Sequence, residues 1–136
     1  MNLKVMSRGE AADFTSDEAW AVISIKSPEM SDVVFDCPNL SGCLRMEFDD
    51  IDRILPGTFP FTQLMAKQVW DFVLEWKDKV SLIGVHCNMG VSRSPAIAAS
   101  ISKALAGDDQ WYFTNKEPNM RVYRIMLHEA HQRGLC

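Results

Sequence analysis

Two residues able to do chemistry together stand six positions apart in the second half of the chain. Cys87 carries a thiol and Arg93 a guanidinium group. The thiolate form of cysteine is a strong nucleophile, and a guanidinium binds an oxyanion through two parallel hydrogen bonds that lysine cannot reproduce. The spacing therefore predicts covalent chemistry at a tetrahedral oxyanion such as phosphate.

The segments on either side of this pair predict how the two side chains are held. The apolar, β-prone residues 81–85 predict a buried strand, and residues 95–106 predict a helix with proline in its first turn. Amide groups and the positive end of the helix dipole gather where a strand passes through a tight loop into a helix. We therefore expect residues 87–93, here called the signature loop, to bind an anion and to hold Cys87 as a thiolate.

The sequence His-Cys-x-x-Gly-x-Ser-Arg-Ser, from His86 to Ser94, resembles the signature of the cysteine-dependent protein tyrosine phosphatases. It is most similar to the small dual-specificity branch of that superfamily. The resemblance agrees with Cys87 as the nucleophile, Arg93 as the phosphate ligand, and Ser94 as a hydroxyl that stabilises the departing sulfur. The expected substrate-binding residues are those of the loop itself: Asn88, Met89, Gly90, Val91, Ser92 and Arg93.

The resemblance also implies an aspartic acid on an earlier loop that protonates the leaving oxygen. Asp49, Asp50 and Asp52 follow a predicted strand over residues 43–48. We favour Asp50, because side chains alternate along a strand and Asp50 should share a face with the apolar Phe48. Asp49 is the next candidate and Asp52 the third. The reaction needs no metal ion and no cofactor.

A second match to the small dual-specificity enzymes is the pair Pro118-Asn119. In these enzymes the asparagine begins the last helix and braces the signature loop. Two departures bear on substrate choice. The chain has no clear tyrosine-recognition loop of the deep-pocket phosphatases, which argues against strict phosphotyrosine selectivity. Asn88, Met89 and Val91 replace the lysines that phosphoinositide phosphatases of this superfamily carry, which argues against lipid headgroups.

Composition and charge describe an ordinary globular chain. Its 136 residues predict one domain over residues 1–136, and the net charge of −4 argues against a nucleic-acid surface. The amino-terminal residues resemble neither a signal peptide nor a membrane span, so we expect a cytoplasmic protein without a membrane partner. The four cysteines lack metal-ligand spacing, and Cys37 and Cys43 are expected to be separate thiols.

Hydrophobic periodicity predicts an α/β fold with a central, mostly parallel sheet flanked by helices, like that of the dual-specificity phosphatases. Besides the strand before Cys87, the predicted strands cover residues 3–6, 20–25 and 43–48. Besides the helix after the signature loop, the predicted helices cover residues 61–77 and a last segment from Asn119 to Gly134. We expect a turn or short helix over residues 8–14 and an irregular segment over residues 107–118.

These observations predict hydrolysis of phosphate monoesters through a phosphocysteine intermediate. The expected substrates are phosphotyrosine proteins, with phosphoserine and phosphothreonine as further candidates. An alternative is a phosphate-reading binding module with little turnover. A third hypothesis is arsenate reduction or sulfur transfer at a similar anion-binding loop. Arsenate reduction would need further cysteines to relay a disulfide, and Cys37 and Cys43 are only vaguely placed for that role. Sulfur transfer explains the presence of Arg93 and Ser94 less well.

Overall fold

Four parallel strands form one sheet in the order β1-β4-β2-β3 in the computed structural model, which describes residues 1–136. The strands are β1 (Asn2–Met6), β2 (Trp20–Lys26), β3 (Leu40–Glu47) and β4 (Leu82–His86). Every neighbouring pair is parallel, which confirms the predicted α/β fold. Strand β3 begins at Leu40, three residues before the predicted start at Cys43.

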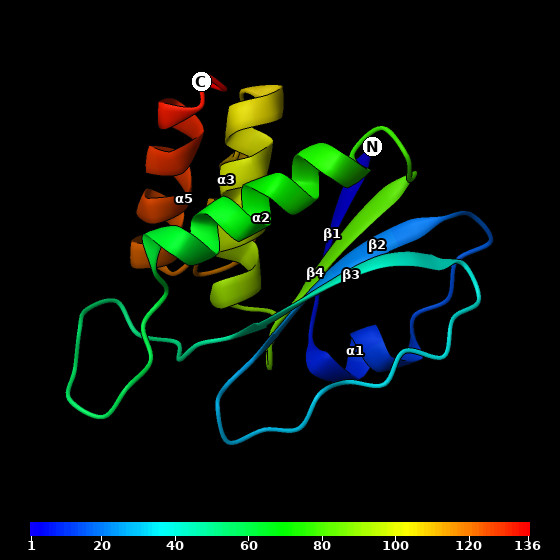
Figure 1. The fold of residues 1–136 in the computed structure, drawn as a ribbon, viewed down its shortest axis with the longest axis horizontal. Coiled ribbons are helices and arrows are strands. Elements are labelled where there is room, and N and C mark those ends of the chain that lie inside the picture. The colour runs from blue at the N-terminus through cyan, green and yellow to red at the C-terminus, as the bar shows by residue number, and fades with distance from the viewer.

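Helices lie on both faces of this sheet (Figure 1). The helices are α1 (Arg8–Asp13), α2 (Gln63–Trp76), α3 (Arg93–Ala106), α4 (Gln110–Asn115) and α5 (Met120–Gln132). Helices α2, α3 and α5 cover one face, and α1 lies against the other (Figure 1). The longest helices have 14 residues, fewer than the roughly 20 that a membrane-spanning helix needs.

Alternation along β2 divides the apolar core into two parts. Ala21, Ile23 and Ile25 point into the large cluster formed with α2, α3 and α5. Trp20 and Val22 point to the opposite face, into a smaller cluster beneath α1. Both faces of β2 are therefore buried, as expected for a central strand of a parallel sheet.

Our prediction of an irregular interval over residues 107–118 is wrong in its middle, where α4 forms. This helix buries none of its residues and has no side-chain cap. It packs against α3, and two contacts join it to α5: the Tyr123 hydroxyl donates a hydrogen bond to Asp109, and the rings of Phe113 and Tyr123 pack edge to face. Local sequence patterns do not report such contacts, because they join distant parts of the chain.

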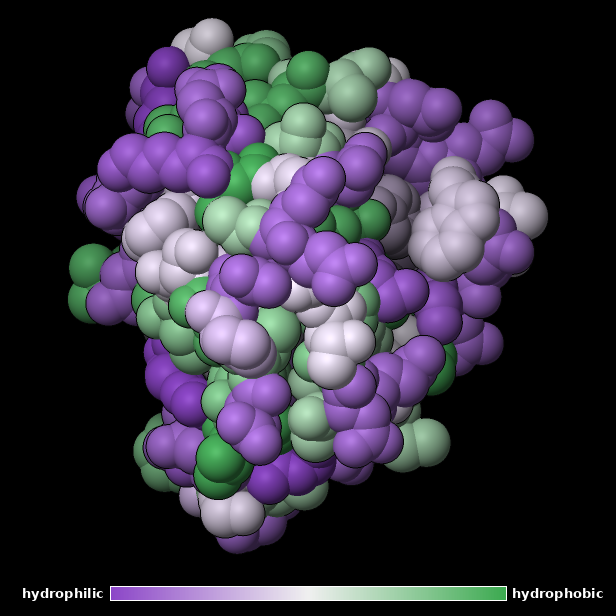
Figure 2. Space-filling model, turned by 90° about the vertical axis from the view of Figure 1, so that its right-hand side faces the viewer, coloured by the Kyte–Doolittle hydropathy of each residue, from purple (hydrophilic) through white to green (hydrophobic).

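Hydrophilic residues cover most of the face that lies on the right-hand side in Figure 1. Figure 2 shows this face, on which hydrophobic residues form small groups separated by polar and charged ones. The face therefore presents no broad apolar surface.

Candidate active site

The carboxyl ends of all four strands meet at the signature loop. Cys87 directly follows β4, and Gly90 packs against the end of β1. Arg93 reaches Ser27, which follows β2, and the carbonyl of Phe48, which follows β3. In open parallel sheets, ligands bind at this edge. The fold thus brings residues from four separate segments to one place.

Gly90 fits where no other residue would. Its φ angle is +72°, in the left-handed region, and an added Cβ would lie 2.8 Å from the Ser7 nitrogen and 2.9 Å from the Met6 carbonyl carbon. Both of these are backbone atoms, so they cannot rotate out of the way. The glycine therefore lets the signature loop turn tightly against the end of β1.

The backbone of the signature loop turns its carbonyl groups toward the rest of the protein. The carbonyls of Asn88, Val91 and Ser92 accept hydrogen bonds of 3.0 Å from the amides of Arg8, Glu117 and Asn119, respectively. The amide of Gly90 donates to the Cys87 sulfur at 3.3 Å. The remaining amides of the loop have no acceptor in the protein: Asn88, Met89, Val91, Ser92 and Arg93. A row of free amides at a helix start is an anion-binding arrangement.

Cys87 lies at the base of a pocket of about 510 Å³. Only 2% of the residue is exposed, and its sulfur lies 3.1 Å from the buried hydroxyl of Ser94. Together with the Gly90 amide, this hydroxyl can stabilise a negatively charged sulfur by donating a hydrogen bond. The residues lining the pocket are Asp50, Cys87, Asn88, Met89, Val91, Ser92, Arg93 and Glu117.

The guanidinium of Arg93 is buried and only partly satisfied. Its Nη1 atom donates to the Phe48 carbonyl at 2.8 Å and to the Ser27 hydroxyl at 2.9 Å. Its Nε atom is the one buried side-chain nitrogen or oxygen in the protein without a partner. A buried donor without a partner is costly, so this atom calls for an acceptor in the pocket.

His86 is buried beside the nucleophile and is held as a neutral ring. Burial lowers the pKa of its imidazole below the ordinary value of 6.5. Its Nδ1 atom lies 3.3 Å from the Cys87 carbonyl, which can only accept, so Nδ1 carries the proton. Its Nε2 atom then accepts from the Ser24 hydroxyl at 2.6 Å. The ring thus fixes the backbone at Cys87.

Of the three candidate aspartates, Asp50 lines the Cys87 pocket. Its Oδ1 atom accepts two hydrogen bonds of 2.8 Å, one from the Ser92 hydroxyl and one from the Asn119 side-chain amide. The Oδ2 atom has no partner in the protein. The carboxyl group therefore joins the loop after β3 to the signature loop and to the start of α5.

The other two aspartates lie differently. Asp49 accepts a hydrogen bond of 2.8 Å from the Phe59 amide, so its carboxylate holds its own loop together. Asp52 is exposed, makes no hydrogen bond or ion pair, and lines an adjoining hollow rather than the Cys87 pocket. Of the three aspartates, Asp50 is therefore the one whose residue lines the Cys87 pocket.

Three contributors to the site were not predicted from the sequence: the Ser27 hydroxyl, the Phe48 carbonyl and Glu117. Ser27 directly follows β2, so the rule that ligands bind at the carboxyl ends of parallel strands could have marked it. Nothing in the local pattern identifies the Phe48 carbonyl. Glu117 lines the rim and is held by its backbone bond to Val91.

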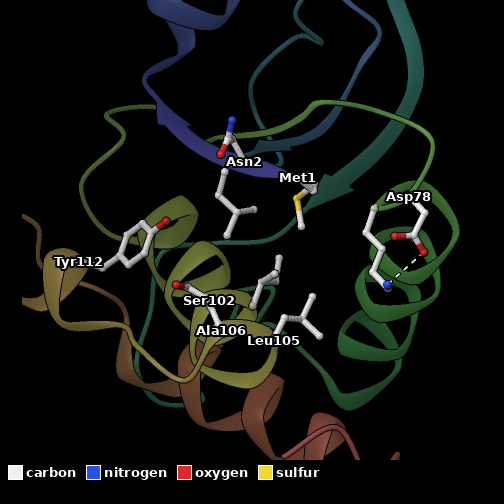
Figure 3. A pocket seen from close by; sticks show the side chains of 10 residues that line it. Met1, Asn2, Asp78, Ser102, Leu105, Ala106 and Tyr112 are labelled. Carbon is white, nitrogen blue, oxygen red and sulfur yellow. Dashed lines mark hydrogen bonds and ion pairs between the residues drawn. The ribbon is translucent and has the colours of Figure 1, made fainter.

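A separate pocket of about 450 Å³ lies at the opposite end of the sheet (Figure 3). Met1 and Asn2 line it from the start of β1, and Ser102 and Leu105 line it from the last turns of α3. It contains no cysteine or histidine, and its lysine, Lys77, is paired with Asp78 at 3.0 Å. It therefore offers neither a thiol nor an imidazole to activate a nucleophile.

Comparison with solved structures identifies the fold. The human tyrosine phosphatase-like serine/threonine/tyrosine-interacting protein is similar with a TM-score of 0.61 and 17% identity over 87% of this chain and 80% of its own. PTPMT1 is similar with a TM-score of 0.58 and 13% identity over 98% and 94% of the two chains. A structure of PTPMT1 in complex with PI(5)P is similar with a TM-score of 0.56 and 15% identity over 85% of this chain and 81% of its own.

No protein-family model matches the chain, and no curated protein matches it in sequence. At these identities the structural similarity establishes the fold. The chain has the α/β fold of the dual-specificity-phosphatase-like proteins, as the resemblance of its signature loop predicted.

Proposed function

We propose that this protein hydrolyses phosphate monoesters without a metal ion, through a phosphocysteine intermediate. The observation that carries the proposal is the unpartnered, buried Nε atom of Arg93, a residue that lines the same pocket as Cys87. The free amides of the signature loop add further donors. A phosphate dianion satisfies all of these donors at once and places its phosphorus over the nucleophile.

In the first step the Cys87 thiolate attacks phosphorus. The S–P bond forms as the bond to the leaving oxygen breaks, and that oxygen takes the bonding electron pair. Asp50 donates a proton to it from Oδ2, so the leaving group departs as a neutral alcohol or phenol. Arg93 and the loop amides hold the three equatorial oxygens throughout.

In the second step water hydrolyses the phosphocysteine. Asp50, now ionised, removes a proton from the attacking water, and the S–P bond breaks as the new O–P bond forms. The sulfur leaves with the bonding electrons. The Ser94 hydroxyl and the Gly90 amide, 3.1 Å and 3.3 Å from the sulfur, stabilise it as a thiolate.

The lining of the pocket supports a protein substrate bearing a single phosphate. It contains one guanidinium and two carboxyl groups, those of Asp50 and Glu117, and no lysine. A polyphosphorylated headgroup would meet little positive charge there. PI(5)P, which is bound in one PTPMT1 structure, carries a single phosphate monoester. Met89 and Val91 expose apolar side chains at the rim, where the ring of phosphotyrosine can pack. Phosphoserine and phosphothreonine proteins are further candidate substrates.

The whole chain, residues 1–136, forms this catalytic domain in our proposal, and we place it in the cytoplasm. All four cysteines are free thiols. A thiolate nucleophile stays active in a reducing compartment, where glutathione and thioredoxin keep thiols reduced.

A phosphate-reading module with little turnover is the second candidate. The two hydrogen bonds to Oδ1 of Asp50 also make this carboxyl group a structural link between three segments, a role that a binding module without turnover would equally need. One structural neighbour is named a phosphatase-like interacting protein. This candidate predicts phosphopeptide binding that persists without hydrolysis.

A panel of phosphotyrosine, phosphoserine and phosphothreonine peptides, assayed in excess EDTA, separates the two candidates. We expect phosphate release from at least the phosphotyrosine peptide, no release by Cys87→Ser, and inhibition by vanadate. Cys43→Ser is the matched control, because Cys43 is an exposed thiol on β3 outside the pocket. Tight binding with no release by the native chain would favour the binding module instead.

A further inference from the structure

Ser92 occupies a capping position but does not cap its helix. It is the N-cap residue of α3, and its side chain makes no capping hydrogen bond. Serine is favoured at this position because its oxygen accepts from an amide one turn into the helix. Here the hydroxyl turns away and donates to Oδ1 of Asp50 at 2.8 Å. The first amides of α3 thereby remain free for an anion.

Asn119 completes the arrangement from the start of α5. Its side-chain amide donates to Oδ1 of Asp50 at 2.8 Å and to the Ile51 carbonyl at 3.0 Å. Its Oδ1 atom accepts from the Val122 amide and caps α5. Asn119 is 7% exposed, so its end of these bonds is shielded from water. The residue braces the loop that carries the aspartate as well as the signature loop.

We infer that Ser92 and Asn119 are positioning residues that decide which oxygen of Asp50 carries the catalytic proton. This inference rests on the proposed hydrolytic function. With both donors directed at Oδ1, that atom serves as the acceptor, and a proton on the carboxyl group resides on Oδ2. Oδ2 has no partner in the protein, so its proton is available to a leaving oxygen in the pocket.

The same bonds fix the distance between acid and nucleophile. Asp50 is an exposed residue, and without restraint its side chain would sample several rotamers. Ser92 belongs to the signature loop and stands next to Arg93, so its bond ties the acid to the element that binds the phosphate. Proton transfer requires such a restraint, because donor and acceptor must come within hydrogen-bond reach.

The dependence of rate on the leaving group tests this inference. 4-Nitrophenolate leaves readily without a proton, whereas the phenolate of phenyl phosphate needs one. The readout is the ratio of kcat/KM for 4-nitrophenyl phosphate to that for phenyl phosphate. Asp50→Asn should raise the ratio about 100-fold, because a positioned acid contributes about 100-fold or more to a rate. Ser92→Ala and Asn119→Ser should each raise it about tenfold, since each removes one of two restraints.

The variants are chosen to keep the fold. Asn119→Ser retains a good N-cap for α5, and Ser92→Ala removes no cap from α3. Ser92→Thr keeps a hydroxyl and should return the ratio to the native value. Ser102→Ala, which removes a hydroxyl from the far end of α3, should leave the ratio unchanged.

An unchanged ratio in both Ser92→Ala and Asn119→Ser, alongside a raised ratio in Asp50→Asn, would overturn the inference and leave the hydrolytic mechanism standing. Equal losses on both esters would also overturn it, because they would indicate a purely structural role. If the native chain hydrolyses neither ester, the proposed function fails and this inference fails with it.

Discussion

The guanidinium of Arg93 donates a hydrogen bond of 2.8 Å to the backbone carbonyl of Phe48, the residue that precedes the aspartate pair. The bond joins the start of α3 to the end of β3 and uses Nη1. The Nε atom, which is buried and has no partner, stays free for a substrate. One side chain thus anchors the loop after β3 and offers a phosphate-binding donor.

Arg93→Lys should lower kcat/KM for an aryl phosphate by roughly 100-fold or more. A lysine keeps the charge, but its single nitrogen cannot bond Phe48 and Ser27 while also holding two phosphate oxygens. Removing one donor from a transition-state anion site costs about 3 kcal/mol, which corresponds to such a loss. Steady-state kinetics of the purified variant provide the measurement.

Arg53→Lys is the control for this substitution. Arg53 is exposed and makes no hydrogen bond, and it lines the hollow beside the Cys87 pocket. We expect its kcat/KM to stay within about twofold of the native value. A comparable loss of kcat/KM in both variants would show that activity depends on positive charge in the region and not on the planar guanidinium group of Arg93.

Gly90→Ala should lower the free energy of unfolding by about 3 kcal/mol. The left-handed conformation costs an L-residue about 1–2 kcal/mol, and contact of the new Cβ with backbone atoms of β1 adds a similar penalty. Gly57→Ala separates the two effects, because Gly57 has a φ of +75° and open space around it. Urea unfolding should show a loss of only about 1–2 kcal/mol for Gly57→Ala. Equal losses at the two positions would contradict the close packing of the signature loop on β1.

His86 should make the protein less stable as the pH falls below about 6.5. Burial lowers the pKa of its imidazole, so in this range the unfolded chain binds a proton that the folded chain does not. The free energy of unfolding then falls by up to about 1.4 kcal/mol per pH unit, and the fall ends at the folded pKa. Hydrogen bonds to Ser7 and Arg133 hold the pKa values of Glu10 and Glu129, respectively, below 4.5, so these two groups change the free energy of unfolding only at lower pH.

Urea unfolding at several pH values tests this contribution. His86→Gln cannot titrate, so its stability should change little over the same range. His128→Gln, at an exposed position on α5, should keep the native slope. If His86→Gln keeps the native slope as well, the neutral buried ring is not the source of the pH dependence.

Local sequence was sufficient to predict much of the structure. The four strands, the amphipathic helix α2 and the Asn119 cap of α5 are confirmed, because alternation, helical periodicity and capping chemistry act over a few residues. Helix α3 begins at Arg93, two residues before the predicted start at Pro95. The arginine therefore lies in the first turn, and its amide is one of those left free for an anion.

The remaining features depend on contacts between distant segments. The strand order places β4 between β1 and β2, and no short pattern encodes that order. Ser27 joins Arg93 across 66 positions, and Ser92 joins Asp50 across 42. Ser92, at the start of α3, directs its hydroxyl to the Asp50 carboxylate, which only folding brings close, and not to its own helix.

Detection of a phosphorylated Cys87 is the most direct test of the mechanism. Asp50→Asn is mixed with excess 4-nitrophenyl phosphate and quenched in acid within the first turnovers. The good leaving group allows the first step, while the missing carboxylate slows hydrolysis of the intermediate. We predict that mass spectrometry finds one phosphoryl group on the peptide containing Cys87, and none in Cys87→Ser treated alike. Phosphate release by Cys87→Ser at the native rate, or turnover of the native chain with no phosphorylated Cys87 in either protein, would contradict the proposed mechanism.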